Sequence, residues 1–231
     1  MRMRKKNNLN ERVLSCADYL IRKIFHTGEK PEQDFIDYIK IFGNSNPVQL
    51  EIGCGKGSFI NETAKNNKNI NFIAVEKSEN VIISAMERTA YEGVSNIRYI
   101  IGRAEYLDLV LPPCSIEQIH LYFSCPFPKS RYAKHRLTHE GFMKIYRKLL
   151  SQGGKINFKT DNSEFFEFSL KSFSENGFRL QNVTHDLHGS NCLSGYRDSY
   201  KSIPKGDIIT EYEKNFIEKG LKIYYLEAFL K

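Results

Sequence analysis

From residue 48 onward, short apolar runs alternate with segments in which apolar residues recur every three or four positions. The apolar runs are rich in Val, Ile and Phe, which predicts β-strands, and the recurring pattern predicts amphipathic helices. The predicted strands are VQLEIG (48–53), NFIAVE (71–76), IRYII (97–101), IHLYF (119–123) and KINFKT (155–160). The predicted helices begin near Lys56, Ser78, Thr138 and Ser163. Such alternation predicts an α/β fold with a mostly parallel sheet and helices on both faces.

The two ends of the chain depart from this pattern. After Phe178, longer runs at 179–187 and 221–230 predict an antiparallel pair of strands at one edge of the sheet. Near the N-terminus, basic side chains crowd the first dozen positions, and glycines and prolines interrupt the residues that follow. We therefore expect a basic, partly mobile N-terminal arm over residues 1–46 and one α/β domain over residues 47–231.

Composition and charge narrow the function classes. With 41% hydrophobic and 13% aromatic residues, the chain is neither intrinsically disordered nor fibrous. Lys and Arg number 34 against 27 Asp and Glu, which gives a net charge of +7. This excess is compatible with a nucleic-acid partner but does not by itself indicate one.

Cysteine usage and hydropathy indicate the compartment. The five cysteines are odd in number, and no two have the C-x-x-C spacing of a zinc or redox site, so we expect a reducing environment and no metal. No apolar run approaches the roughly 18 residues of a membrane span. The basic start of the chain is not followed by the apolar region of a secretory signal. We therefore expect a cytoplasmic protein.

A glycine-rich turn follows the first predicted strand in LEIGCGKGSF (50–59). Gly53 and Gly55 allow positive φ and a close approach of the backbone to a ligand. The spacing is G-x-G-x-G, which differs from the dinucleotide motif G-x-G-x-x-G and lacks the spacer of a phosphate-binding P-loop. Glu51 lies two residues before Gly53, where a carboxylate suits a ligand with a cationic amine better than a polyphosphate.

A second carboxylate, Glu76, ends the next predicted strand. At this place in a doubly wound sheet an acid can accept hydrogen bonds from both hydroxyls of a ribose. Either Glu51 or Glu76 alone is most simply interpreted as a solvated residue at the end of a strand. Together, in register with the glycine turn, they indicate S-adenosylmethionine as the ligand.

Three further stretches follow strand ends or lie outside the core pattern. LYFSCPFPKSRYAKHRL (121–137) carries four cations, which suit phosphate contacts but also an ordinary solvated helix start. They are Lys129, Arg131, Lys134 and Arg136. NFKTDN (157–162) places Asp161 at the same edge of the sheet. In ITEYEKNF (209–216), Thr210 and Glu213 could form a helix capping box, since their spacing fits one.

These motifs, in this order, resemble the bacterial tRNA (guanine-N7-)-methyltransferases over nearly the whole chain. The most specific matches are FKTDN (158–162) and TEYE (210–213) after the glycine turn. The resemblance implies a Rossmann-like methyltransferase fold that forms 7-methylguanosine in the variable loop of tRNA, at position 46 of the tRNA. It implies that Glu51, Gly53, Gly55 and Glu76 bind S-adenosylmethionine. It also implies that the substrate guanosine is bound by Lys129, Asp161, Thr210, Glu211, Tyr212 and Glu213.

The chain departs from the family pattern near the expected site. The family motif F-S-D-P-W-P-K reads FSCPFPK here, so Cys125 replaces an acid and Phe127 replaces a tryptophan. Arg103 stands where the family has an acid beside the adenine, with Glu105 two residues later. The stretch 192–206 is longer than the family pattern predicts.

Loss of the acid at position 125 leaves the catalytic residue unassigned. Guanine N7 has an in-plane lone pair and no proton, so it can attack a methyl group without a general base. Loss of one charge-assisted hydrogen bond costs about 1.5–3 kcal/mol, so we expect a slower enzyme. One alternative is a tRNA-binding paralogue with weakened or no catalysis. Another, a nucleotide-dependent oxidoreductase, is disfavoured by the glycine spacing and by Glu51.

Overall fold

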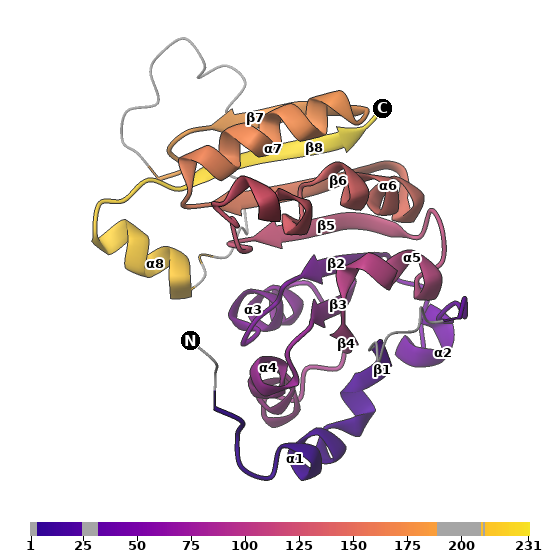
Figure 1. Cartoon of the computed structure of the whole chain (residues 1–231). Helices are drawn as coiled ribbons and strands as arrows, with labels where there is room; N and C mark the ends of the chain where they lie inside the picture. The colour runs from indigo at the N-terminus through magenta and orange to yellow at the C-terminus, as the bar shows by residue number, and fades with distance from the viewer. Residues whose placement is uncertain (1–3, 25–31, 189–208, 210) are drawn as a thin grey trace.

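The computed structural model describes residues 4–24, 32–188, 209 and 211–231. In these ranges the strands form one eight-stranded sheet in the order β1-β4-β3-β2-β5-β6-β8-β7 (Figure 1). The strands are β1 (Leu20–Ile24), β2 (Val48–Ile52), β3 (Asn71–Glu76), β4 (Ile97–Gly102), β5 (Ile116–Tyr122), β6 (Leu150–Thr160), β7 (Phe178–Thr184) and β8 (Tyr224–Leu230). The five strands predicted between residues 48 and 160 are confirmed, although β5 and β6 begin earlier than predicted.

Strand direction agrees with the predicted architecture. Neighbouring strands from β1 to β6 in the sheet order are parallel, whereas β8 is antiparallel to both β6 and β7. The predicted antiparallel pair at the C-terminal edge is therefore confirmed. The chain proceeds outward from β2 through β3 to β4, and then returns to place β5 on the other side of β2. The carboxyl ends of β2 and β5 thus mark the point where the strand order reverses.

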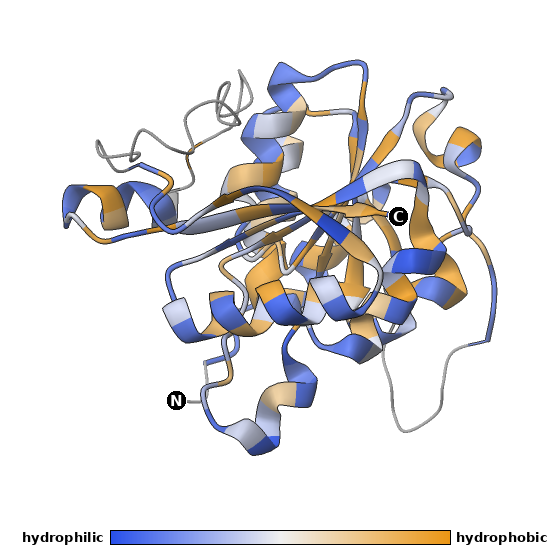
Figure 2. Ribbon diagram, turned by 90° about the horizontal axis from the view of Figure 1, so that it is seen from above, coloured by the Kyte–Doolittle hydropathy of each residue, from blue (hydrophilic) through white to orange (hydrophobic). Residues whose placement is uncertain are grey.

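Helices cover both faces of the sheet (Figure 2). One apolar cluster contains residues of α1, α3 and α4, and the other contains residues of α5, α6 and α7. The helices are α1 (Leu9–Ser15), α2 (Tyr38–Phe42), α3 (Ser58–Asn66), α4 (Glu79–Tyr91), α5 (Leu107–Val110), α6 (Glu140–Leu149), α7 (Ser163–Glu175) and α8 (Glu211–Glu218). Alternate residues of β3 point to opposite clusters, with Phe72 and Ala74 in one and Ile73 and Val75 in the other.

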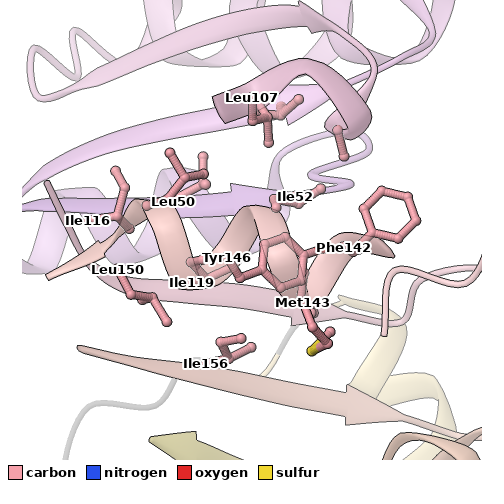
Figure 3. Close-up of a cluster of buried hydrophobic side chains, with 14 of the residues drawn as sticks. Leu50, Ile52, Leu107, Ile116, Ile119, Phe142, Met143, Tyr146, Leu150 and Ile156 are labelled. Carbon is pink, nitrogen blue, oxygen red and sulfur yellow. The ribbon is translucent and has the colours of Figure 1, made fainter. Parts of the chain in front are cut away.

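The larger cluster forms where α6 packs on the centre of the sheet (Figure 3). Phe142 and Tyr146 lie on one face of α6 and contribute to the same buried cluster as Leu50 of β2, Ile119 of β5 and Ile156 of β6. This is the helix face that the i, i+4, i+7 spacing of apolar residues predicts. The centre of the sheet is therefore fixed by packing directly beneath its ligand-facing edge.

The N-terminal region is more ordered than its sequence predicts. The chain forms α1 and β1 where a partly mobile arm was expected, and β1 pairs in parallel with β4. Val13 of α1 is buried against α4, and Arg12 forms an ion pair with Glu87, with 2.6 Å between Nε and Oε1. The described part of residues 9–24 thus packs on the sheet. The division of the chain at residues 46 and 47 stays a prediction.

Two features singled out in the sequence lie outside the described residues. They are the long stretch 192–206 and Thr210 of the TEYE motif. Within the described ranges, no helix is long and apolar enough to cross a membrane.

Packing of α1 can be tested with two neighbouring substitutions. Val13→Asp places a carboxylate in the buried cluster and should lower the free energy of unfolding by about 3 kcal/mol, the scale for an unpartnered buried polar group. Leu14 is 72% exposed, so Leu14→Asp is the matched control and should change little. Urea unfolding measures both. Equal effects would mean that α1 does not pack on α4 in solution.

Candidate active site

A cavity of about 770 Å³ opens at the carboxyl ends of the central strands. Its walls come from the segments that follow β2, β3, β4 and β5, at residues 52–53, 75–77, 102–105 and 123–127, with Pro126 excepted. Tyr132, His135, Leu137 and Phe142 complete the lining. In a doubly wound sheet, ligands bind at this edge, where the strand order reverses.

The glycine turn connects β2 to α3, and its Gly53 lines the cavity. Gly53 and Gly55 have φ of 84° and 58°, and an added Cβ would meet nothing within 4 Å at either position. The backbone there is exposed to an incoming group in a conformation that other residues rarely adopt. Gly57 differs, because a Cβ would lie 2.5 Å from the Ala85 Cβ. Its role is to let α3 pack closely on α4.

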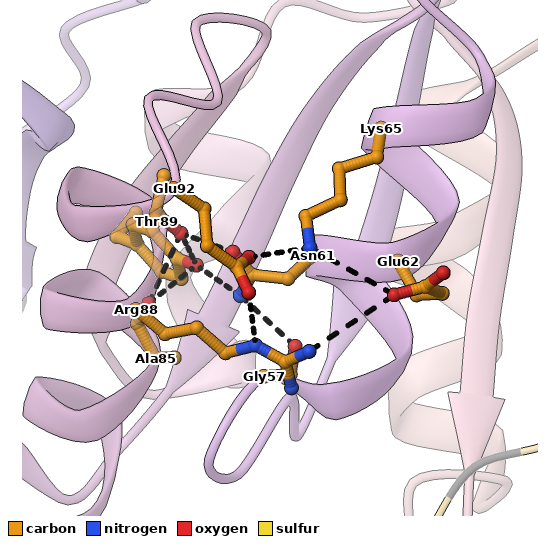
Figure 4. A network of polar contacts seen from close by, with 9 residues as sticks. Gly57, Asn61, Glu62, Lys65, Ala85, Arg88, Thr89 and Glu92 are labelled. Atoms are coloured by element: carbon orange, nitrogen blue, oxygen red, sulfur yellow. Dashed lines mark hydrogen bonds and ion pairs between the residues drawn. The ribbon is translucent and has the colours of Figure 1, made fainter.

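Polar contacts between α3 and α4 hold this turn in place (Figure 4). The Asn61 amide donates to the Gly57 carbonyl at 2.9 Å, and Thr89 Oγ1 donates to Asn61 Oδ1 at 2.6 Å. At the surface, Lys65 and Arg88 both contact Glu92, at 2.8 and 3.2 Å. The turn is therefore fixed before any ligand arrives.

Glu51 is a buried acid at the end of β2. Glu51 is only 4% exposed, and its Oε2 has no hydrogen-bond partner among the described residues. Burial raises the pKa of Glu51 to about 8, and the nearby charge of Glu76 adds to the effect. An unpartnered carboxylate at such a place is unfavourable unless a ligand supplies a donor or a positive charge.

Glu76 and the acid–base pair after β4 line the next part of the cavity. Glu76 Oε1 accepts a hydrogen bond from the Ser78 amide at 3.0 Å, which orients the carboxylate at the end of β3. Arg103 forms an ion pair with Glu105. Burial opposes ionisation of Glu105, but the hydrogen bond and charge of Arg103, together with a backbone hydrogen bond and the charge of His135, lower the pKa of Glu105 overall. Both charges of this pair are thus present at the rim.

The loop after β5 brings Cys125 to the cavity. Cys125 is exposed, and the neighbouring Phe123 and Phe127 have positive φ of 51° and 42°. Arg136 braces this loop, since its guanidinium donates to the carbonyls of Pro126 at 2.9 Å and Phe127 at 3.1 Å. Arg136 was expected to contact phosphate together with its basic neighbours. The structure uses its charge within the loop instead.

The structure brings two of the predicted substrate residues, Asp161 and Tyr212, together, and places the others apart from them or leaves them undescribed. Tyr212 of α8 donates to Asp161 Oδ2 at 3.4 Å, and its ring lies 4.8 Å from that of Phe123, between centroids. Lys129 is exposed and, within the described chain, no hydrogen bond or ion pair joins it to this group. Glu213 is completely buried. The side chain of Glu211, like Thr210, lies outside what the structure describes.

Sequence reasoning missed several residues at the site. The aromatic lining includes Phe123 and Tyr132, which lay within a quoted motif but were assigned no role. Sequence reasoning also assigned no role to Lys159 and His188, which both contact Glu213. One signal was present, because Lys159 is a charged residue inside a strand that otherwise reads as buried. In the described ranges no group of three or more His, Cys, Asp or Glu side chains could hold a metal ion.

The strain at Glu51 can be measured in the protein without ligand. Its folded pKa is raised, so the folded state binds more protons than the unfolded state between about pH 4.5 and pH 8. Stability should therefore fall as pH rises through this window. Glu51→Gln should remove this dependence and stabilise the protein at pH 8 by about 1–3 kcal/mol, the cost of a buried group without a partner. Denaturant unfolding at several pH values tests this, and a variant with unchanged pH dependence would contradict it.

Comparisons with known proteins agree with this geometry. Residues 45–226 match the family model described as "Putative methyltransferase". The tRNA (guanine-N(7)-)-methyltransferase of Brevibacillus brevis is 36% identical over 99% of this chain and 98% of its own length. That of Bacillus velezensis is 40% identical over 99% and 96%. The crystal structure of the 16S rRNA methyltransferase KamB superposes with a TM-score of 0.60 at 14% identity, over 86% of this chain and 95% of that one, and so shares the fold.

The family match thus spans the strands that build the cavity, and the fold is that of the Rossmann-like methyltransferases. The relatives at 36–40% identity extend the similarity to both ends of the chain. By sequence and by fold, the chain belongs to the tRNA (guanine-N7-)-methyltransferase family.

Proposed function

We propose that this protein transfers a methyl group from S-adenosylmethionine to N7 of a guanine in tRNA, in the variable loop at position 46. The observation that carries the proposal is the similarity over nearly the full chain to proteins named for this reaction. The cavity at the carboxyl ends of β2 to β5 supports it, because its lining combines the carboxylate of Glu76 with an aromatic wall, and the buried Glu51 directly precedes its lining residues Ile52 and Gly53. Both features suit a ligand with a cationic end and a ribose, beside a planar base.

The residues on one side of the cavity fit the cofactor. The unpartnered Oε2 of Glu51 can accept from the methionine amine, and a positive charge there would stabilise the ionised acid. Glu76 lies where a carboxylate accepts from both ribose hydroxyls. Gly53 and Gly55 leave space for close approach of the backbone. When bound, S-adenosylmethionine supplies an electrophilic methyl group on its sulfonium.

Groups that suit a guanine lie beside Phe123, which lines the cavity. Phe123 and Tyr212 offer ring faces, and the Asp161 carboxylate beside them can accept hydrogen bonds from guanine N1–H and the exocyclic amine. Lys129 is an exposed cation that follows the loop of Cys125. We assign Thr210, Glu211 and Glu213 to the same substrate region by family resemblance.

Catalysis requires positioning more than proton transfer. Guanine N7 carries a lone pair and no proton, so the chain need not provide a general base. Its task is to hold N7 in line with the methyl group at near-attack distance and to exclude water. We assign no catalytic acid, because Cys125 lies at the cavity position where the family pattern has one.

Incubation of unmodified tRNA with methyl-labelled S-adenosylmethionine, followed by nucleoside analysis, tests the function. The proposal predicts label in 7-methylguanosine from the variable loop. Label in another nucleoside would contradict it. Binding of tRNA and S-adenosylhomocysteine without any label would favour the non-catalytic paralogue instead.

Cys125→Asp tests the departure from the family pattern. If the residue at this position faces the guanine edge, a carboxylate should restore a charge-assisted hydrogen bond and raise the rate of methyl transfer about tenfold. Cys125→Asp combined with Phe127→Trp is the fuller restoration, since both positions line the cavity. Single-turnover transfer to tRNA measures both variants. A lower rate in both would show that the pocket has been rebuilt around the thiol.

Salt dependence tests the basic surface beside the cavity. Arg131 and Lys134 are exposed, and we expect them to contact tRNA phosphates together with the basic residues near the N-terminus, Arg4 and Lys5. Neutralising Lys134 should lower the magnitude of the slope of log affinity against log salt by roughly one per lost phosphate contact. Lys148→Gln is the control, because Lys148 is exposed and precedes β6, at the opposite edge of the sheet. Equal slopes for both variants would mean that Lys134 is only solvated.

A further inference from the structure

A lysine is completely enclosed at the carboxyl end of β6. Lys159 is 1% exposed, and its Nζ lies 3.3 and 3.4 Å from the two carboxylate oxygens of Glu213, a residue with no exposed surface. The Lys159 ammonium also lies 4.9 Å from the centroid of the Tyr122 ring. Desolvation makes such a pair costly to bury, and removal of one partner leaves an uncompensated charge that is more costly still. Lys159 therefore constrains where Glu213, and the helix that carries it, can lie.

Lys159 connects three segments at the edge of the cavity. Its carbonyl accepts from the Phe123 amide at 2.9 Å, which extends the β5–β6 pairing to a cavity residue. Its side chain holds Glu213 near the start of α8, beyond the carboxyl ends of β5 and β6 (Figure 1). Glu213 also contacts His188, with 2.7 Å between Oε1 and Nε2. The ends of β5 and β6, the segment after β7 and α8 thus meet at one buried carboxylate.

Tyr212, the residue next to Glu213, lies against Phe123 and Asp161. Tyr212 is 46% exposed. On its other side it stacks on Phe216, whose ring packs against a small apolar cluster of Leu187, Ile223 and Tyr225. If α8 moved away from β6, Tyr212 would lose its place beside Asp161.

We propose that Lys159 is a positioning residue for the substrate side of the site: it acts through Glu213, which anchors α8 so that Tyr212 meets the guanine. This inference rests on the proposed function. Glu213 has no exposed surface and contacts Lys159 and His188, so under this proposal its contribution to substrate binding is indirect. Tyr212, Phe123 and Asp161 form the surface that contacts the base.

Lys159→Met, compared with Lys155→Met, tests the proposal. Lys155 is on the same face of the same strand and forms an ion pair with Glu227 at 2.8 Å, but it has no contact with α8 in the described structure. Lys159→Met should lower kcat/KM for tRNA on the order of 100-fold, because misplacement of a positioning group has an effect of this size. Lys155→Met should leave kcat/KM unchanged.

Two further measurements separate positioning from a general loss of structure. S-adenosylhomocysteine affinity, measured by calorimetry, should be unchanged in Lys159→Met, because Glu51 and Glu76 lie on β2 and β3. Amide hydrogen exchange should become faster in residues 211–218 and stay slow in β6. A kcat/KM for Lys159→Met equal to that of Lys155→Met would overturn the proposal, as would unchanged exchange in α8.

Glu213→Gln provides an independent test if Lys159→Met does not fold. A glutamine keeps the shape and an acceptor for Lys159 but removes the charge of the pair. Under the proposal, its penalty in kcat/KM is the same for tRNA with guanine or hypoxanthine at the target. If Glu213 contacts the guanine amine directly, the penalty disappears with hypoxanthine, which lacks that amine, and the proposal fails. Absence of methyl transfer by the wild-type protein would instead contradict the proposed function itself.

Discussion

The site depends on the reversal of strand order between β2 and β5. Because β3 and β4 lie on one side of β2 while β5 and β6 lie on the other, the segments that follow β2 and β5 diverge and leave a cavity between them. The apolar packing of α6 on β2, β5 and β6 fixes these strands directly beneath the cavity. The walls of the cavity follow from this arrangement, since four of its lining segments lie at or directly after the ends of β2, β3, β4 and β5.

Two buried charges at this edge are handled in opposite ways. Glu51 has an oxygen without a protein partner and a raised pKa, so its burial is unfavourable until a cationic group arrives. Lys159 already has its counter-ion in Glu213, so its burial fixes α8. Glu51 thus keeps an acceptor oxygen without a partner among the described residues, whereas the Lys159–Glu213 pair joins β6 to α8.

Local patterns predicted the centre of the fold and the glycine turn at its ligand-facing edge. The strands from β2 to β6 and the glycine turn carry apolar runs and glycines whose meaning depends on few distant residues, and they were predicted correctly. The short strand β1, LIRKI, was missed because it contains two cations and pairs with only one neighbour. The roles of Arg136 and Lys159 were also missed. Their partners are backbone carbonyls of a strained loop and a carboxylate 54 residues away, which no local pattern contains.

The function proposed for this chain requires the N7 lone pair of the target guanine to receive the methyl group. The most direct measurement uses two tRNAs that differ only at the target nucleotide, one with guanine and one with 7-deazaguanine, which replaces N7 by a carbon. Both are incubated with methyl-labelled S-adenosylmethionine, and binding of each tRNA is measured in parallel. We expect comparable binding of the two tRNAs, label in the guanine tRNA and no label at the target of the 7-deazaguanine tRNA. Equal labelling of the two target nucleotides would contradict the proposed function.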